Sequence, residues 1–79
     1  MLIASSIVKV IPGNEEILKE DINQIQGVEV VAQEDGNLVI VLESKTTREL
    51  EGITEKISKL PKVMGVFPVY INMEALAQA

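Results

Sequence analysis

The sequence contains no cysteine, histidine or tryptophan, and its aromatic residues are one phenylalanine and one tyrosine. The absence of cysteine and histidine excludes disulfide bonds, thiol chemistry, imidazole bases and the usual zinc or copper sites. Acidic residues are present, but none are spaced like the ligands of a calcium-binding loop. Ser5 or Ser6 with Lys9 is no credible catalytic dyad. We therefore expect no metal, no other cofactor and no enzymatic activity.

Long apolar runs are also missing. No stretch approaches the roughly 20 residues of a membrane-spanning helix. The N-terminus lacks the basic region of a secretory signal, and Ser5, Ser6 and Lys9 interrupt its apolar start. These features predict a cytoplasmic protein that does not insert into membranes.

The charge is negative: 12 acidic and 7 basic residues give a net charge of −5. Such a surface repels nucleic acid and favours cationic partners, although mild acidity is also ordinary for cytoplasmic proteins. What the chain does have is aliphatic residues, since 47% of its 79 residues are hydrophobic. We expect residues 1–79 to form a single domain with an aliphatic core, and residues 72–79 to be a flexible tail.

Hydrophobic periodicity and turn residues predict four strands and two helices in the order βαββαβ. Asn14 is a suitable N-cap for the first helix, Asp35-Gly36 is a strong hairpin signal, and Thr46-x-x-Glu49 has the pattern of a capping box. The predicted strands span residues 2–11, 28–33, 38–43 and 63–71, and the helices run from Asn14 to about Gln26 and from Thr46 to before Pro61. The expected helical stripes are Ile17, Leu18, Ile22 and Ile25, then Leu50, Ile53, Ile57 and Leu60.

Two segments reveal an internal repeat. Residues 25–28 and 60–63 each close a helix and open a strand at the same spacing. Two βαβ units form the split βαβ arrangement of the ferredoxin-like α+β fold. Right-handed crossovers place both helices on one face of a four-stranded antiparallel sheet with strand order 4-1-3-2.

Alternation along the strands predicts which side chains face away from the helices. We expect Ser6, Val8, Val10 and the core residues Leu18, Ile22, Leu38, Ile40, Leu42, Ile53 and Ile57 to lie on the helix side. The open face, opposite the helices, is expected to carry Ser5, Ile7, Lys9, Glu29, Val31, Gln33, Val39, Val41, Glu43, Met64, Val66, Pro68 and Tyr70.

This predicted open face is apolar at its centre and charged at its ends. Exposed apolar area usually marks an interaction surface. Strand propensity alone, or a homodimer interface, would explain the same residues. RNA binding is not indicated, because the two central strands carry no aromatic residues.

The sequence resembles the NapD family, the cytoplasmic chaperones dedicated to the catalytic subunit of the periplasmic nitrate reductase. The resemblance spans about residues 3–71 and rests on residues 5–8 (SSIV), 27–30 (GVEV), 38–43 (LVIVLE), 65–66 (GV) and 69–70 (VY). It implies binding of the precursor's twin-arginine signal peptide as a helix on the open sheet face, which delays export until the molybdenum cofactor is inserted. The implied peptide-binding residues are Ser5, Ile7, Lys9, Glu29, Val31, Val39, Val41, Glu43, Met64, Val66 and Tyr70.

Two other functions fit the same pattern. One is a regulatory module of the ACT type, which would form a ligand-dependent dimer and bind an amino acid at its interface. The other is a structural domain that assembles through its sheet. The chaperone hypothesis instead predicts a monomer that binds a peptide.

Overall fold

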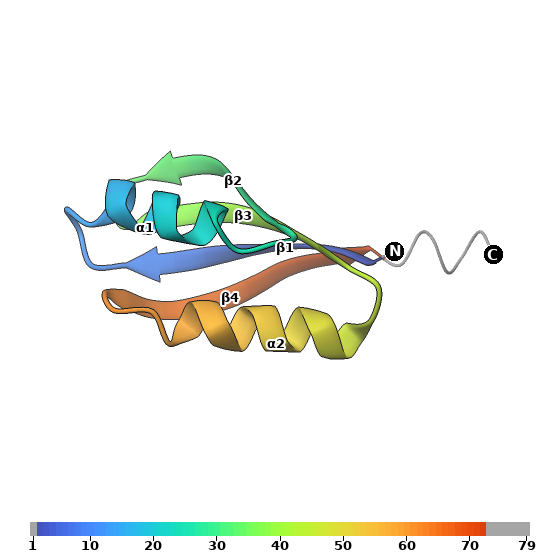
Figure 1. Ribbon diagram of the computed structural model, residues 1–79. Coiled ribbons are helices and arrows are strands. Elements are labelled where there is room, and N and C mark those ends of the chain that lie inside the picture. The colour runs from blue at the N-terminus through green and yellow to red at the C-terminus, as the bar shows by residue number, and fades with distance from the viewer. Residues whose placement is uncertain (1, 73–79) are drawn as a thin grey trace.

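The computed structural model describes residues 2–72, and for residues 70–72 it describes the backbone alone. It contains six elements in the predicted βαββαβ order (Figure 1). The strands are β1 (Leu2–Val10), β2 (Val28–Glu34), β3 (Asn37–Ser44) and β4 (Val63–Asn72), and the helices are α1 (Glu15–Asn23) and α2 (Thr47–Ser58). The tail predicted from residue 72 onward falls almost wholly outside the described residues.

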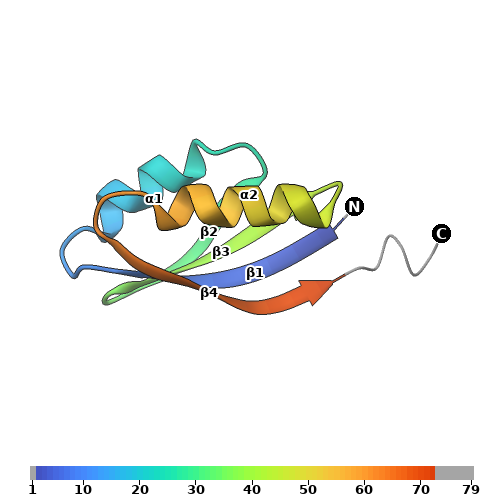
Figure 2. The same cartoon turned by 90° about the horizontal axis from the view of Figure 1, so that it is seen from below.

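The four strands form one antiparallel sheet in the order β2-β3-β1-β4. Both helices lie on the same face of this sheet, as Figure 2 shows from below. This is the ferredoxin-like α+β fold that the sequence predicts, with β1 and β3 at the centre.

The core lies between the sheet and the two helices. Alternate residues of β1 and β3 point into it, because successive side chains of a strand point to opposite faces. Of the predicted core, six side chains are at most 2% exposed and Ile53 is partly buried, the six being Leu18, Ile22, Leu38, Ile40, Leu42 and Ile57. Ile17 was predicted on the buried stripe, but it is 61% exposed. The short helix α1 turns only the stripe of Leu18 and Ile22 towards the sheet.

The start of α1 differs from the prediction in its chemistry. Asn14 occupies the N-cap position, but its side chain caps no helical N–H and donates instead to the carbonyl of Ile11. The Glu15 carboxylate accepts hydrogen bonds from the backbone N–H groups of Gly13 and Gly36. The helix also ends at Asn23, three residues before the predicted end, because the following N–H groups bond at i→i−3 spacing.

The start of α2 confirms the capping box. Glu49 N–H donates to Thr46 Oγ1 at 3.1 Å. The Glu49 carboxylate returns to the chain one residue earlier than the usual motif, where it accepts from Lys45 N–H at 3.1 Å. The polar first turn therefore ties α2 to the end of β3.

Two bulges decide which way the residues of β4 face. In the pairing of β4 with β1, two residues of β4 have no partner, and each forms a bulge. The first is Met64, which lies between the paired residues Val63 and Gly65. The second is Val69, which lies between the paired residues Pro68 and Tyr70. An extra residue in one strand reverses the alternation that follows it. The predicted outward facing of Val66 and Pro68 is therefore wrong, since they pair with Val8 and Ser6, whose side chains are buried on the helix side.

A third bulge lies in β2. The register with β3 skips Val31, so that Ala32 pairs with Val39 and Gln33 pairs with Leu38. The predicted outward facing of Gln33 is wrong for the same reason: its partner Leu38 faces the core.

Candidate functional site

The centre of the open face is built by the two interior strands. Ser5 pairs with Val41 and Ile7 pairs with Val39, and all four side chains are half-buried. Among the described residues, no helix covers this face, since α1 and α2 lie on the opposite side (Figure 2). The predicted facing of the four central residues, Ser5, Ile7, Val39 and Val41, is confirmed. Aliphatic side chains thus form an exposed floor on the middle of the sheet.

Strand β2 adds one side of the face. Glu29 pairs with Val41 and is exposed, as predicted. Past the bulge, Ala32 takes the position beside Val39 that alternation had assigned to Val31. Val31 itself has no partner in the ladder and is 53% exposed.

Strand β4 adds the other side, with a residue that the sequence prediction missed. Phe67 pairs with Ile7 and is 54% exposed. Met64 is a bulge residue and is 63% exposed. Tyr70 pairs with Ser5, on the predicted face by register, but its side chain lies outside the described residues. Gly65 could have revealed the change of alternation ahead of Phe67, because glycine inside a strand commonly marks a bulge.

Charged side chains lie at the ends of this face. Glu43 pairs with Ile3 at one end, and Lys9 pairs with Asn37 at the other, and both are exposed as predicted. Near Glu43 the sheet has a small hollow of about 200 Å³, which is lined by Gly27, Val28, Glu29, Val41 and Glu43. Two carboxylates therefore border a depression beside the apolar floor.

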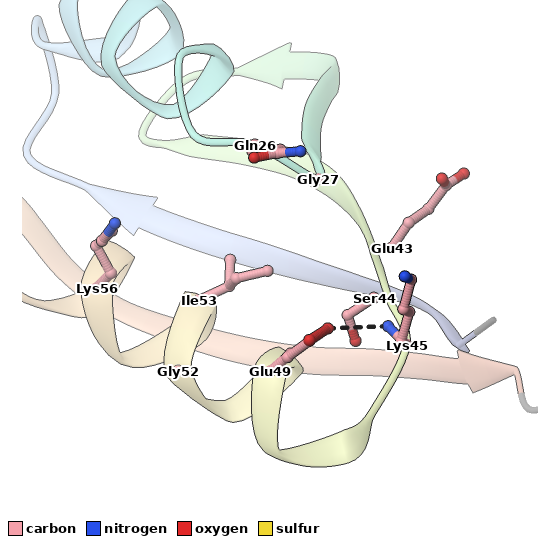
Figure 3. Close-up of a pocket in the computed structure, with 9 residues that line it drawn as sticks. All are labelled: Gln26, Gly27, Glu43, Ser44, Lys45, Glu49, Gly52, Ile53 and Lys56. Atoms are coloured by element: carbon pink, nitrogen blue, oxygen red, sulfur yellow. Dashed lines mark hydrogen bonds between the residues drawn. The ribbon is translucent and has the colours of Figure 1, made fainter.

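A larger hollow of about 720 Å³ lies between the end of β3, the loop after α1 and the first turns of α2 (Figure 3). Its lining mixes acidic and basic groups: Gln26, Gly27, Glu43, Ser44, Lys45, Glu49, Gly52, Ile53 and Lys56. The Glu49 carboxylate already accepts a hydrogen bond from the backbone N–H of Lys45. This arrangement offers no nucleophile beside a base, and we assign no chemistry to it.

Within residues 2–72, no three acidic side chains come together in a way that could hold a metal ion. Over the same residues, neither helix is long and apolar enough to cross a bilayer. The apolar, uncovered face with its acidic end is the feature on which we base a function.

The sequence model of the NapD protein family matches residues 1–75. The chain belongs to the NapD family. Among solved structures, the chain is similar to the solution structure of the E. coli Tat proofreading chaperone protein NapD, with a TM-score of 0.82 and 23% identity. That match covers 91% of this chain and 78% of the E. coli chain, and it shows a shared fold. No curated protein is significantly similar to the chain in sequence.

Proposed function

We propose that this NapD-family protein is a cytoplasmic chaperone that binds the twin-arginine signal peptide of a periplasmic nitrate reductase precursor. The peptide binds the open face of the sheet and is held there until the molybdenum cofactor has been inserted. The protein acts as a monomer and catalyses no reaction.

The observation that carries the proposal is the apolar, uncovered face on the central strands. An antiparallel sheet with one free face normally presents polar side chains to water on that face. Here Ile7, Val39 and Val41 stand there instead, with Phe67 beside them. An apolar floor with charged ends suits an amphipathic peptide, which buries its own apolar side and leaves its basic residues near the carboxylates. A signal peptide has this chemistry, since a basic region precedes an apolar segment.

Most of the contact residues expected from the sequence keep a part in this proposal. Ile7, Val39 and Val41 form the floor, and Phe67 lies beside it. The other proposed contacts are Ser5, which lies within the floor, and the surrounding residues Lys9, Glu29, Val31, Glu43, Met64 and Tyr70. Val66 is left out because it packs against the core.

The first prediction concerns Val39, which lies on a central strand with its side chain on the open face, between its register partners Ile7 and Ala32. Val39→Asp should weaken binding of a synthetic twin-arginine signal peptide at least about 100-fold, because a carboxylate would be buried unpaired against apolar groups of the peptide. An NMR titration that follows backbone amide shifts of wild type and variant measures this. The shifts should concentrate on β1, β3 and β4.

Ile17→Asp is the matched control, because Ile17 is also an exposed aliphatic residue but belongs to α1 in the helix layer. It should leave the affinity unchanged. A folded Val39→Asp protein that binds as tightly as wild type, or amide shifts confined to the helices, would contradict the proposal. Dimerisation on adding an amino acid, without any peptide binding, would favour the ACT-type function.

A further inference from the structure

On the open face, the neighbouring carboxylates of Glu29 and Glu43 lie on one side and the aromatic ring of Phe67 lies on the other. Glu29 and Glu43, here called the acidic corner, lie on β2 and β3. Met64 and Phe67, here called the apolar edge, lie on β4 and are 63% and 54% exposed. Figure 1 shows β2 and β4 on opposite sides of the sheet. A ligand covering this face therefore meets different chemistry on its two sides.

The acidic corner favours a positively charged group. Its two carboxylates border the hollow of about 200 Å³, and the Glu43 N–H bonds to the carbonyl of Gly27 at 2.8 Å, which fixes the backbone beneath them. The opposite end of the face is less negative. Lys9 and Glu34 both pair with Asn37 there, so that one charge offsets the other. Complementarity of charge thus directs a basic group to the acidic corner.

The apolar edge presents an aromatic surface next to the floor. A side chain at Gly65 would bring its Cβ within 3.0 Å of the ring carbon Cζ of Phe67, so the ring lies over this glycine. Phe67 also pairs with Ile7, which makes the edge continuous with the floor. A large apolar side chain from a ligand can bury itself there.

The separation of the two sides matches the length of the apolar segment of a signal peptide. Glu29 and Phe67 are three strand spacings and two residues apart in the register. With about 4.8 Å between strands and about 3.3 Å per residue, this corresponds to roughly 16 Å. A helix rising 1.5 Å per residue covers that span in about ten residues. The apolar segment after the basic region of a signal peptide has roughly 7–15 residues.

We propose that the signal peptide lies diagonally across the sheet, with its arginines at the acidic corner and the far part of its apolar segment against Phe67 at the apolar edge. This orientation rests on the proposed function. In this orientation Phe67 is an apolar anchor for the peptide. The peptide then binds in one direction, from the acidic corner to the apolar edge, and not in the reverse direction.

Two spin-labelled forms of a synthetic peptide with adjacent arginines and about ten following apolar residues test the orientation. A label ahead of the arginines should broaden the amides of residues 28–29 and 41–43. A label after the apolar segment should broaden those of residues 64–67. Binding with the reverse pattern, or with both labels at the same end of the sheet, would overturn the orientation alone. No binding of either peptide would overturn the proposed function as well.

Substitution of the anchor gives an independent measurement. Phe67→Ala should weaken binding at least about tenfold, because the ring's burial is lost, while Phe67→Leu should recover most of the affinity. Ile17→Ala removes an equally exposed apolar side chain from the helix layer and should change nothing. Equal affinities of Phe67→Ala and wild type would contradict the assignment of Phe67.

Discussion

Glu15 joins two loops that are far apart in the chain. Its Oε2 accepts from Gly36 N–H in the β2–β3 turn at 2.7 Å, and its Oε1 accepts from Gly13 N–H at 2.9 Å. The hydrogen bond from Gly36 is the largest cause that lowers the pKa of the Glu15 carboxyl below its ordinary value of 4.5, followed by backbone hydrogen bonds from its own N–H and from Gly13. The ionised carboxylate is thus part of the fold at neutral pH.

This lowered pKa predicts a pH dependence of stability. A group whose pKa is lower in the folded protein stabilises it above the unfolded pKa, and the contribution disappears as the pH falls through the folded value. Glu15→Gln should therefore be less stable than wild type at pH 7, and the difference should shrink as the pH falls from about 4.5 through the lower folded pKa. Denaturant unfolding at pH 7, 4.5 and 3 measures the difference.

Glu16→Gln is the control for this change, because Glu16 is an exposed glutamate in the same first turn of α1. It removes the same charge and should show a much smaller dependence on pH. Equal behaviour of the two variants would mean that the helix dipole acts on both residues and that the hydrogen bonds of Glu15 are unimportant.

At the scale of elements, the two helix-to-strand connections confirm the internal repeat. Val28 N–H bonds to Ile25 O in the first, and Val63 N–H bonds to Leu60 O in the second. The residue before each strand has a positive φ, 88° at Gly27 and 75° at Lys62. The same backbone therefore serves both halves, although only the first has the glycine that this conformation favours.

This difference predicts opposite effects of two substitutions. Gly27→Ala should destabilise the protein by at least about 1–2 kcal/mol, since its φ disfavours any side chain, and its Cβ would lie 2.7 Å from the carbonyl oxygen of Glu43. Lys62→Gly should be neutral or stabilising by up to about 1 kcal/mol, because strain is relieved while the unfolded chain gains freedom. Denaturant unfolding of the two variants measures both effects. A clear destabilisation by Lys62→Gly would show that the lysine side chain has a structural role.

The bulges of β4 also act at the scale of an element. Unpaired strand edges invite pairing with other chains, and bulges or proline on an edge oppose it. β4 is an edge strand with two bulges and Pro68 between them. The same irregularities that turn Phe67 to the open face thus make this edge a poor template for strand addition.

At the scale of the whole molecule, a chain of net charge −5 is proposed to receive a ligand with two arginines. Exposed charges are screened over about 8 Å at physiological ionic strength. Affinity for the synthetic peptide should therefore fall modestly as salt rises, with each exposed carboxylate contributing about 0.2–1 kcal/mol. Calorimetric titrations at two salt concentrations measure the change.

A double variant separates the acidic corner from the net charge. Glu29→Gln with Glu43→Gln should abolish most of the salt dependence, whereas Glu16→Gln with Glu20→Gln, on α1, should retain it at the same net charge. An affinity of wild type that does not respond to salt would leave the acidic corner an ordinary solvated surface.

The sequence by itself determined the order of the elements, the hairpin turn and the facing of the two central strands. These features depend on local chemistry: Asp35-Gly36 suits a tight turn, Thr46 and Glu49 cap a helix, and strict alternation continues along β1 and β3. The NapD-like pattern of strands also followed from residues that are close in the chain. Each of these signals is complete within a few residues.

Only the tertiary structure decided which side chains of β2 and β4 complete the site. Val66 faces the core and Phe67 the open face because Met64 is skipped in the pairing with β1, and Ala32 replaces Val31 because the pairing with β3 skips one residue. The hydrogen bond from Gly36 N–H to the Glu15 carboxylate likewise joins groups that lie 21 residues apart in the chain. A bulge is a mismatch between two strands, so its position is set by the partner's register as well as by the strand's own residues.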